Sequence, residues 1–227
     1  MGSSVVVAMD GPSGSGKSST ARGVAARLGL RYLDTGAMFR AITWWMLQQG
    51  IHVDDQARVA ARVGEPVLDS GTEPLAPTIT VDGTNVAGPI RSQEVTSAVS
   101  AVSAVPEVRA RLLEMQRSII GGGGIVVEGR DIGTVVAPGA AVKVFLTADA
   151  GARAVRRTAE MEGATVEATQ QDLIRRDMAD SGRATSPFVM AADAYHIDTT
   201  PYTLDEVIAQ VIALVQQAED PVGPSDA

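Results

Sequence analysis

Short apolar runs alternate with longer amphipathic segments along most of this chain. Residues 5–9, 125–127 and 141–146 are largely apolar runs of strand length, and turn residues follow the first of them. Such runs are typical of strands that are buried on both faces of a parallel sheet. Because segments of helical periodicity separate these runs, the pattern predicts an α/β fold with a parallel central sheet.

Helices and two further strands complete the predicted elements. Several of the helices end at a glycine or begin at a capping residue, as helix boundaries commonly do. The first four predicted helices are residues 21–28, 37–49, 93–103 and 107–120. Two more lie within 150–178, where Gly163 divides them and Thr165 caps the second, and a last helix runs from a capping box at 203–206 to residue 217. The added strands are residues 30–33 and 196–198. Residues 179–193 are expected to form a polar loop, and residues 218–227 a disordered tail.

Residues 64–91 have a different texture from the rest of the chain. Gly, Pro, Thr and Asp interrupt short strand candidates there, and Asp82-Gly83 between two of them is a typical hairpin turn. We interpret this segment as a small antiparallel unit inserted into a single domain that spans residues 1–227.

Composition excludes several classes of protein. With 227 residues, 45% of them hydrophobic, the chain can bury a core without a disulfide or a structural metal. It has no cysteine, which excludes thiol catalysis, Cys-ligated zinc and disulfide frameworks. No apolar run approaches the roughly 18 residues of a membrane span, and the N-terminus lacks a signal-peptide pattern. We therefore expect a cytoplasmic protein that does not bind a membrane.

The charge balance is acidic, with 19 basic and 27 acidic side chains and a net charge of −8. A protein that binds nucleic acid without sequence preference needs a basic surface, so we expect no nucleic-acid partner. Lys17 and Lys143 are the only lysines, so 17 basic side chains are arginines. Two explanations remain open: a genome that favours arginine codons, or guanidinium groups that clamp phosphates.

A phosphate-binding motif follows the first predicted strand. The segment from Gly11 to Ser18 fits G-x-x-x-x-G-K-[ST], with a buried strand before it and an amphipathic helix after it. Backbone N–H groups of such a loop and the positive end of the helix dipole bind anionic oxygens. The residues expected to bind ATP are Gly11, Pro12, Ser13, Gly14, Ser15, Gly16, Lys17, Ser18, Ser19 and, from a later helix, Arg157. Lys17 is expected to reach the β- and γ-phosphates, and Ser18 or Ser19 to help hold Mg²⁺.

The class of triphosphate-binding protein follows from what else the chain contains. A GTPase needs an Asn/Thr-Lys-x-Asp motif, and neither lysine stands in one. Small P-loop kinases remain, and these need an acceptor site and a lid with arginines. Arg130-Asp131 follows a predicted buried strand, where α/β sheets bind their ligands. The other candidate lid groups are Arg153, Arg156 and Arg157, expected near the start of one helix, Arg175 and Arg176 at the end of another, and Asp180 and Arg183 in the loop beyond.

Four sequence strings resemble those of one particular family of small P-loop kinases. They are Asp10 to Lys17, Leu33-Asp34-Thr35-Gly36-Ala37-Met38-Phe39-Arg40, Ile90-Arg91-Ser92-Gln93-Glu94-Val95 and Glu128-Gly129-Arg130-Asp131-Ile132-Gly133-Thr134-Val135-Val136. Together they resemble the bacterial cytidylate kinase family over nearly the whole chain. The resemblance implies a three-layer P-loop kinase fold with helices on both faces of the sheet, an acceptor-nucleotide unit over residues 64–105 and a helical lid over 150–185.

The resemblance also implies roles for individual residues. It places Ser100, Arg109 and Asp131 at the cytosine, and Thr35, Arg40 and Arg130 at the acceptor phosphate with Arg91 nearby. Asp180 and Arg183 match sugar contacts, and Arg176 matches an arginine that faces the phosphates. The catalytic groups would be Lys17, Arg130, Arg176 and Arg183. Simpler roles remain open for three of these residues: a capping Thr35, a helix-face Arg40 and a core-helix Ser100. Glu128 could orient a Mg²⁺-bound water or be an ordinary loop acid.

The implied reaction is transfer of the γ-phosphoryl group of ATP to CMP or dCMP, with Mg²⁺ as cofactor. These small-molecule nucleotides are the expected partners, and we expect the protein to be a monomer. Two alternatives remain: another small P-loop kinase, for shikimate, gluconate or a different nucleotide, or an ATP-binding regulatory protein without transfer activity.

Overall fold

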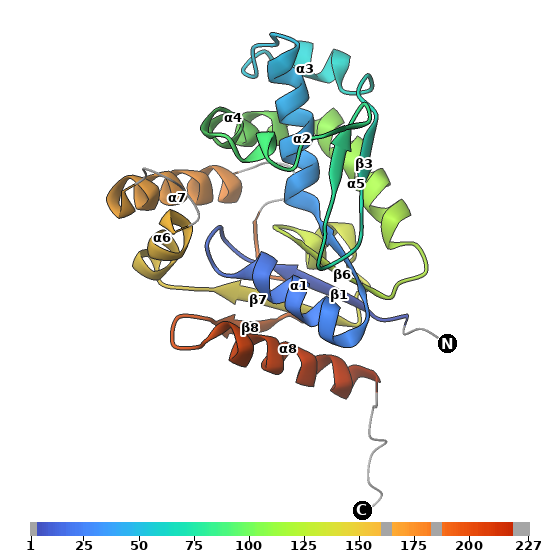
Figure 1. Ribbon diagram of the computed structural model, residues 1–227, viewed down its shortest axis with the longest axis vertical. Helices are drawn as coiled ribbons and strands as arrows, with labels where there is room; N and C mark the ends of the chain where they lie inside the picture. Colours follow the sequence, from blue (N-terminus) through green and yellow to red (C-terminus); the bar gives the residue numbers. More distant parts are fainter. Residues whose placement is uncertain (1–3, 160–164, 183–187, 220–227) are drawn as a thin grey trace, which may run out of the picture.

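A five-stranded parallel sheet forms the centre of the computed structural model (Figure 1). The structure describes residues 4–159, 165–182 and 188–219, so Gly163, Arg183 and residues 220–227 of the expected tail lie outside the described residues. The strand order is β2-β6-β1-β7-β8. The strands are β1 (Val6–Asp10), β2 (Arg31–Asp34), β6 (Ile125–Gly129), β7 (Val142–Thr147) and β8 (Tyr195–Asp198). The predicted parallel α/β sheet is confirmed.

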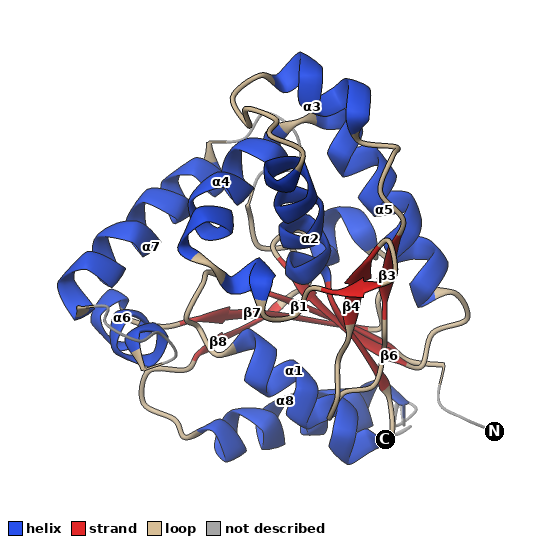
Figure 2. Cartoon of the chain, turned by 45° about the horizontal axis from the view of Figure 1, so that its top comes forward, coloured by secondary structure: helices blue, strands red, loops and turns tan. Residues whose placement is uncertain are grey.

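Helices cover both faces of this sheet (Figure 2), which gives three layers. α1 and α8 pack on one face, and α2 and α5 on the other. Side chains of β1 alternate between the two cores: Val7 and Met9 face α1 and α8, whereas Ala8 faces α2. The helices are α1 (Lys17–Leu28), α2 (Thr35–Gln48), α3 (Gln56–Arg62), α4 (Gln93–Ala104), α5 (Pro106–Ile120), α6 (Ala150–Thr158), α7 (Val166–Ser181) and α8 (Leu204–Glu219). None of the helices in the described part of the chain is long and apolar enough to cross a membrane.

The inserted antiparallel unit is present as a second sheet of β3 (Leu68–Ser70), β4 (Ile79–Val81) and β5 (Thr84–Asn85). Asp82 and Gly83 both have positive φ, 50° and 76°, as a two-residue hairpin turn requires. The inward side chains of β3 and β4 belong to the same core as α2. The unit is therefore packed against the main domain rather than separate from it.

Several predicted boundaries were wrong. Helix α3 was not predicted, because a single side chain in it, Val59, is buried and its hydrophobic periodicity is therefore weak. α7 continues to Ser181, which places Asp180 in a helix instead of a loop. Arg156 and Arg157 lie in the last turn of α6, not near its start, because the Asp149 carboxylate caps the helix from Ala150. Arg175 and Arg176 lie past the middle of α7 rather than at its end.

Other arginines bind backbone carbonyl groups at the ends of elements. Arg31 donates to the carbonyls of Ile119, Ile120 and Gly123 at 2.7–2.9 Å, which satisfies the carboxyl end of α5. Arg117 does the same for a π-helical turn, Ile132–Val136, that the sequence analysis did not predict. Besides codon usage and phosphate binding, the capping of backbone carbonyl groups is therefore a third reason for the many arginines.

Candidate active site

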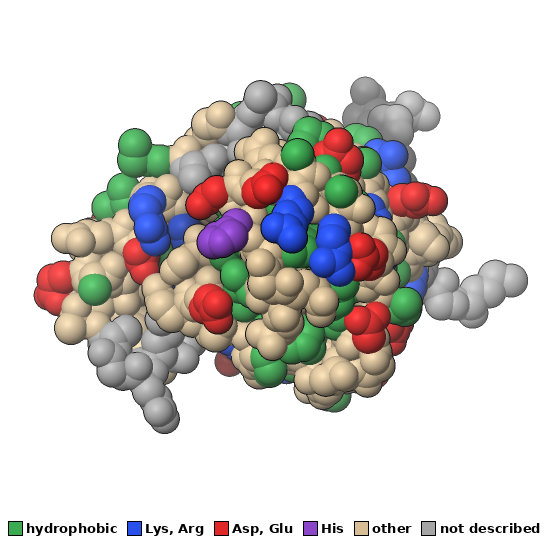
Figure 3. All heavy atoms as spheres, turned by 90° about the horizontal axis from the view of Figure 1, so that it is seen from above, with side chains coloured by type: hydrophobic (Ala, Val, Ile, Leu, Met, Phe, Trp, Pro, Cys, Tyr) green, Lys and Arg blue, Asp and Glu red, His purple; other side chains and the backbone are tan. Residues whose placement is uncertain are grey.

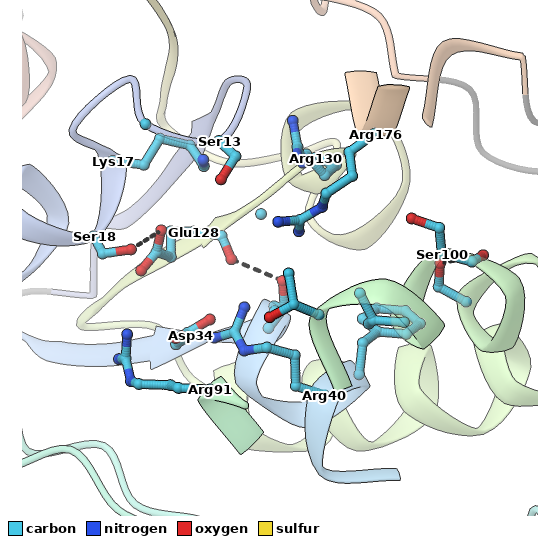
Figure 4. Close-up of a pocket in the computed structure, with 18 of the residues that line it drawn as sticks. Ser13, Lys17, Ser18, Asp34, Arg40, Arg91, Ser100, Glu128, Arg130 and Arg176 are labelled. Carbon is cyan, nitrogen blue, oxygen red and sulfur yellow. Dashed lines mark hydrogen bonds and ion pairs between the residues drawn. The ribbon is translucent and has the colours of Figure 1, made fainter. Parts of the chain in front are cut away.

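A pocket of about 300 Å³ opens at the carboxyl ends of β1, β2 and β6. Figure 4 shows side chains from the P-loop, α2, α4, the turn after β6 and α7 that point into it. The predicted residues that line it are Ser13, Gly14, Gly16, Lys17, Ser18, Ser19, Thr35, Arg40, Arg91, Ser100, Arg109, Arg130, Asp131, Arg157 and Arg176. Gly11, Pro12 and Ser15 are buried in the loop behind them. Arg183 and the side chain of Asp180 lie outside the described residues.

Positive charge gathers in this pocket although the whole chain is acidic. Among the residues that the structure describes, seven arginines and Lys17 line it, against Asp34, Glu128 and Asp131. On the face seen in Figure 3, by contrast, acidic and basic side chains are interspersed. A concave site of one charge sign attracts oppositely charged ligands, so the pocket favours phosphorylated molecules.

The P-loop curls around the position that Lys17 occupies. Gly14 has φ +79°, and a Cβ atom there would lie only 2.8 Å from the carbonyl oxygen of Arg153, so this position requires glycine. Lys17 Nζ donates to the carbonyl of Pro12 at 3.0 Å. Burial, together with the nearby charge of Arg130, lowers the pKa of Lys17 to about 8. A polyphosphate beside this ammonium group would replace the lost solvation.

Glu128 forms a buried polar cluster under the P-loop. Its Oε2 accepts a hydrogen bond from Ser18 Oγ at 2.9 Å, and its Oε1 accepts one from the Tyr32 hydroxyl. Burial raises the pKa of Glu128, and the charge of Asp34 on the neighbouring strand β2 adds to the increase. The interpretation of Glu128 as a loop acid was wrong, because it lies in β6 and is buried. Tyr32 was not predicted, since it reads as an ordinary strand residue.

The first two turns of α2 present Thr35 and Arg40 to the pocket. Asp34 caps the helix by accepting from the backbone of Ala37 at 2.8 Å, so the interpretation of Thr35 as the cap was wrong. Thr35 Oγ1 donates instead to the Glu128 carbonyl at 2.7 Å. Arg40 is not an ordinary helix-face residue, because it lines the pocket and forms a 3.0 Å ion pair with Asp34. In Figure 4, Arg91 lies on the same side of the pocket as Arg40 and Asp34.

Arg109 and Asp131 form an ion pair at the other end of the pocket. Their side chains are only 9% and 8% exposed. Arg109 Nη1 also donates to the Ser103 carbonyl at 3.2 Å, and the guanidinium lies 5.4 Å from the Phe39 ring centroid. Among the described residues, Arg109 Nε has no hydrogen-bond partner, which leaves a buried donor at this end of the pocket. Ser100 lines the pocket beside this pair, so it is not a purely core residue of α4.

Asp10, at the end of β1, holds the backbone that carries Arg130 and Asp131. Its two carboxylate oxygens accept from the N–H groups of Ile132 and Gly133, both at 2.8 Å. Burial raises the pKa of Asp10 to about 6, although these two hydrogen bonds act in the opposite direction. From the sequence, Asp10 was only the first residue of the P-loop string. Its partners lie more than 120 positions away, which no local pattern could indicate.

Comparison with known proteins decides the family. The sequence model of one family, cytidylate kinase, matches residues 7–217 of this chain. The chain belongs to the cytidylate kinase family. It is 62% identical over 215 residues to the cytidylate kinase of Streptomyces coelicolor, and the matched region covers 94% of this chain and 93% of the relative. It is 60% identical to the cytidylate kinase of Streptomyces avermitilis, with the same two coverages.

Solved structures support the fold. A gluconokinase from Sinorhizobium meliloti 1021 superimposes with a TM-score of 0.51 over 97% of each chain, at 16% sequence identity. At this identity the likeness shows the three-layer kinase fold alone. Membership of the cytidylate kinase family confirms the resemblance inferred from four sequence strings and makes the chain a phosphotransferase. A regulatory protein without transfer activity is therefore not favoured.

Proposed function

We propose that this one pocket carries out the complete reaction: transfer of the γ-phosphoryl group of ATP to CMP or dCMP, which gives ADP and CDP or dCDP. The observation that carries the proposal is the continuity of the pocket. The same cavity is lined by Lys17 and Ser18 of the P-loop and by the Arg109–Asp131 pair more than 90 positions away. It therefore offers a triphosphate site and a polar, selective site within one space.

The P-loop is the proposed donor site. Its glycines turn backbone N–H groups toward bound phosphates, and Lys17 supplies a positive charge at the β- and γ-phosphates. Arg157 and Arg176 line the same pocket from α6 and α7. Together these groups stabilise the charge that spreads over the transferring phosphoryl group and help to exclude water.

The oxygen donors at Ser18 fit a magnesium ion. Hydroxyl and carboxylate oxygens are the ligands that this hard cation prefers, and Ser18 Oγ is already paired with Glu128. The two neighbouring carboxyl groups of Glu128 and Asp34 also favour a cation, because burial and the charge of Asp34 both raise the pKa of Glu128. We propose that Ser18, rather than Ser19, binds Mg²⁺, with Glu128 behind it. Bound there, Mg²⁺ neutralises charge on the phosphates of ATP.

The acceptor phosphate is placed by Thr35, Arg40, Arg91 and Arg130. No strong general base is needed, because the second pKa of a phosphate monoester is about 6 and the group is mostly dianionic at pH 7. Catalysis is then positioning and charge stabilisation. Arg40 is held by Asp34 in a 3.0 Å ion pair, so its guanidinium is already oriented on the pocket wall.

The Arg109–Asp131 pair, with Ser100, is the proposed reader of cytosine. The carboxylate accepts from the exocyclic amine of cytosine, and the guanidinium donates to N3 and O2. Uracil presents the opposite donor and acceptor pattern at N3 and C4, so binding it would leave buried groups unpaired. Asp180 and Arg183 remain proposed sugar contacts on the family resemblance alone. The expectations of a monomer and of a cytoplasmic location likewise rest on the sequence.

An acceptor panel tests the proposal. With ATP and Mg²⁺, a coupled assay of ADP release is run with CMP, dCMP, UMP, AMP and shikimate side by side. We expect rapid turnover with CMP or dCMP, and at least tenfold lower kcat/KM with UMP because of the unpaired groups. AMP and shikimate should give only the background rate. A preference for any acceptor other than a cytidine nucleotide would contradict the proposal.

A further inference from the structure

One carboxylate, that of Asp177 in α7, joins two arginines from other parts of the fold. Asp177 Oδ2 accepts from Arg153 Nη1 at 2.6 Å, and its Oδ1 lies 3.4 Å from Arg130 Nη1. Arg153 belongs to α6, and Arg130 to the turn after β6. Three segments that are distant in the sequence therefore meet at this single acid.

The same two arginines also bind the P-loop. Arg153 Nη1 donates to the Ser13 carbonyl at 3.2 Å, and Arg130 Nη1 donates to the Gly11 carbonyl at 3.3 Å. The backbone of Arg153 lies against Gly14, so closely that there is no room for a Cβ atom at that position. Asp177 thus connects α7 to the P-loop in two ways, through Arg153 to Ser13 and through Arg130 to Gly11.

Asp177 lies behind the pocket wall, whereas its neighbour Arg176 lines the pocket. In Figure 4, Arg176 extends from α7 toward the side chain of Arg130. Successive residues of a helix point about 100° apart, so the two neighbours serve different surfaces. The contacts of Asp177 with Arg153 and Arg130 hold this part of α7 in place. They therefore also set the position from which the Arg176 side chain extends into the pocket.

We propose that Asp177 is a positioning residue for phosphoryl transfer, which holds Arg130 and Arg176 in the places where they act on the phosphates. The inference rests on the proposed function of those two arginines. An acid is suited to this place because Arg130, Arg153 and Lys17 carry like charges around one loop, and a shared carboxylate offsets their repulsion. Asparagine has nearly the same shape but lacks the charge, so it would hold the two guanidinium groups less firmly.

Asp177→Asn is the first variant, and Asp172→Asn on the same helix is its matched control. Asp172 forms an ion pair with Arg175 in which both side chains are largely exposed, 41% and 65%. We expect Asp177→Asn to lower kcat by about tenfold to a hundredfold, because displacements of about 1 Å at a reacting centre have effects of this size. The KM values for ATP and CMP should change little, since the P-loop amides and the Arg109–Asp131 pair are unaltered. The control should stay within about twofold of wild type in kcat.

A double-mutant cycle tests whether Asp177 acts through Arg130. In an Arg130→Met background, which is already slow, adding Asp177→Asn should lower kcat by a much smaller factor than it does in wild type. Effects that multiply in the double variant would overturn the action of Asp177 through Arg130, and equal kcat for Asp177→Asn and Asp172→Asn would overturn the whole inference. Both outcomes leave the proposed function intact. Full activity of Arg130→Met would contradict the proposed role of Arg130, and the inference with it.

Thermal unfolding of each variant separates a lost fold from lost positioning. If Asp177→Asn does not fold, Asp177→Glu and Asp172→Glu replace the pair, because glutamate keeps the charge and moves it by one methylene. A lower kcat for Asp177→Glu alone supports the inference, and equal kcat for these two variants overturns it.

Discussion

Replacing Lys17 with alanine is expected to lower kcat by about 10²–10³-fold while the fold stays intact, since removal of a single preorganised charge-stabilising donor from an active site has effects of this size. In the described part of the chain the side chain donates only to the Pro12 carbonyl, and burial of its ammonium group lowers its pKa to about 8. Its loss therefore removes charge at the phosphates more than it removes structural support. Steady-state kinetics with CMP and ATP, together with thermal unfolding, measure both effects.

The control for this variant is Arg27→Ala, which removes a cation from the same helix α1. Arg27 pairs with Asp205 of α8 at an exposed position away from the pocket. Exposed ion pairs contribute little to stability, so this variant should retain nearly full activity. Near-normal turnover of Lys17→Ala would show that the donor phosphates are not bound where we place them.

Replacing Asp131 with asparagine is expected to reduce the preference for CMP over UMP by about a hundredfold, because an amide donor can pair with the C4 oxygen of uracil. The KM for ATP should change far less, since the P-loop is unaltered. The variant should also be less stable by about 3–5 kcal/mol, because it leaves the buried Arg109 guanidinium without its carboxylate. Competition between CMP and UMP measures the preference, and urea unfolding measures the stability.

Asp193→Asn is the matched control for Asp131→Asn. Asp193 forms a 2.7 Å ion pair with the buried amine of Lys143, and neither residue lines the pocket. This variant therefore also removes an acid from a buried cation, but it should leave the CMP-to-UMP ratio unchanged. An unchanged CMP-to-UMP ratio in Asp131→Asn would show that Asp131 does not recognise the base. An equal loss of this preference in both variants would show that the effect comes from reduced stability alone.

Features that depend on a few consecutive residues could be predicted from the sequence. The P-loop is one, because its chemistry needs glycines, Lys17 and a hydroxyl at fixed spacing beside a buried strand. The parallel sheet is another, because its three central strands, β6, β1 and β7, are mostly buried and therefore mostly apolar. α3 was missed for the converse reason: only Val59 in it is buried, so the segment has almost no periodicity to detect.

Supporting contacts between distant segments could not be predicted. Asp10 accepts from two N–H groups more than 120 positions away, and Tyr32 binds Glu128 across neighbouring strands. Nothing near Asp177 indicates that it joins Arg153 to Arg130. The residues that we propose to contact substrate were named by the P-loop motif and by the family resemblance. The residues that hold those groups in place become visible only when the chain is folded.

The most direct test of the single-pocket account is a crystal structure with adenosine and cytidine joined by a polyphosphate chain. The account predicts that the chain runs from the P-loop past Lys17 and Ser18 to Arg40 and Arg130. The cytosine ring should contact the Arg109–Asp131 pair. A cytosine bound elsewhere, or a polyphosphate that leaves the P-loop empty, would contradict the claim that this pocket binds ATP and a cytidine nucleotide in position for phosphoryl transfer.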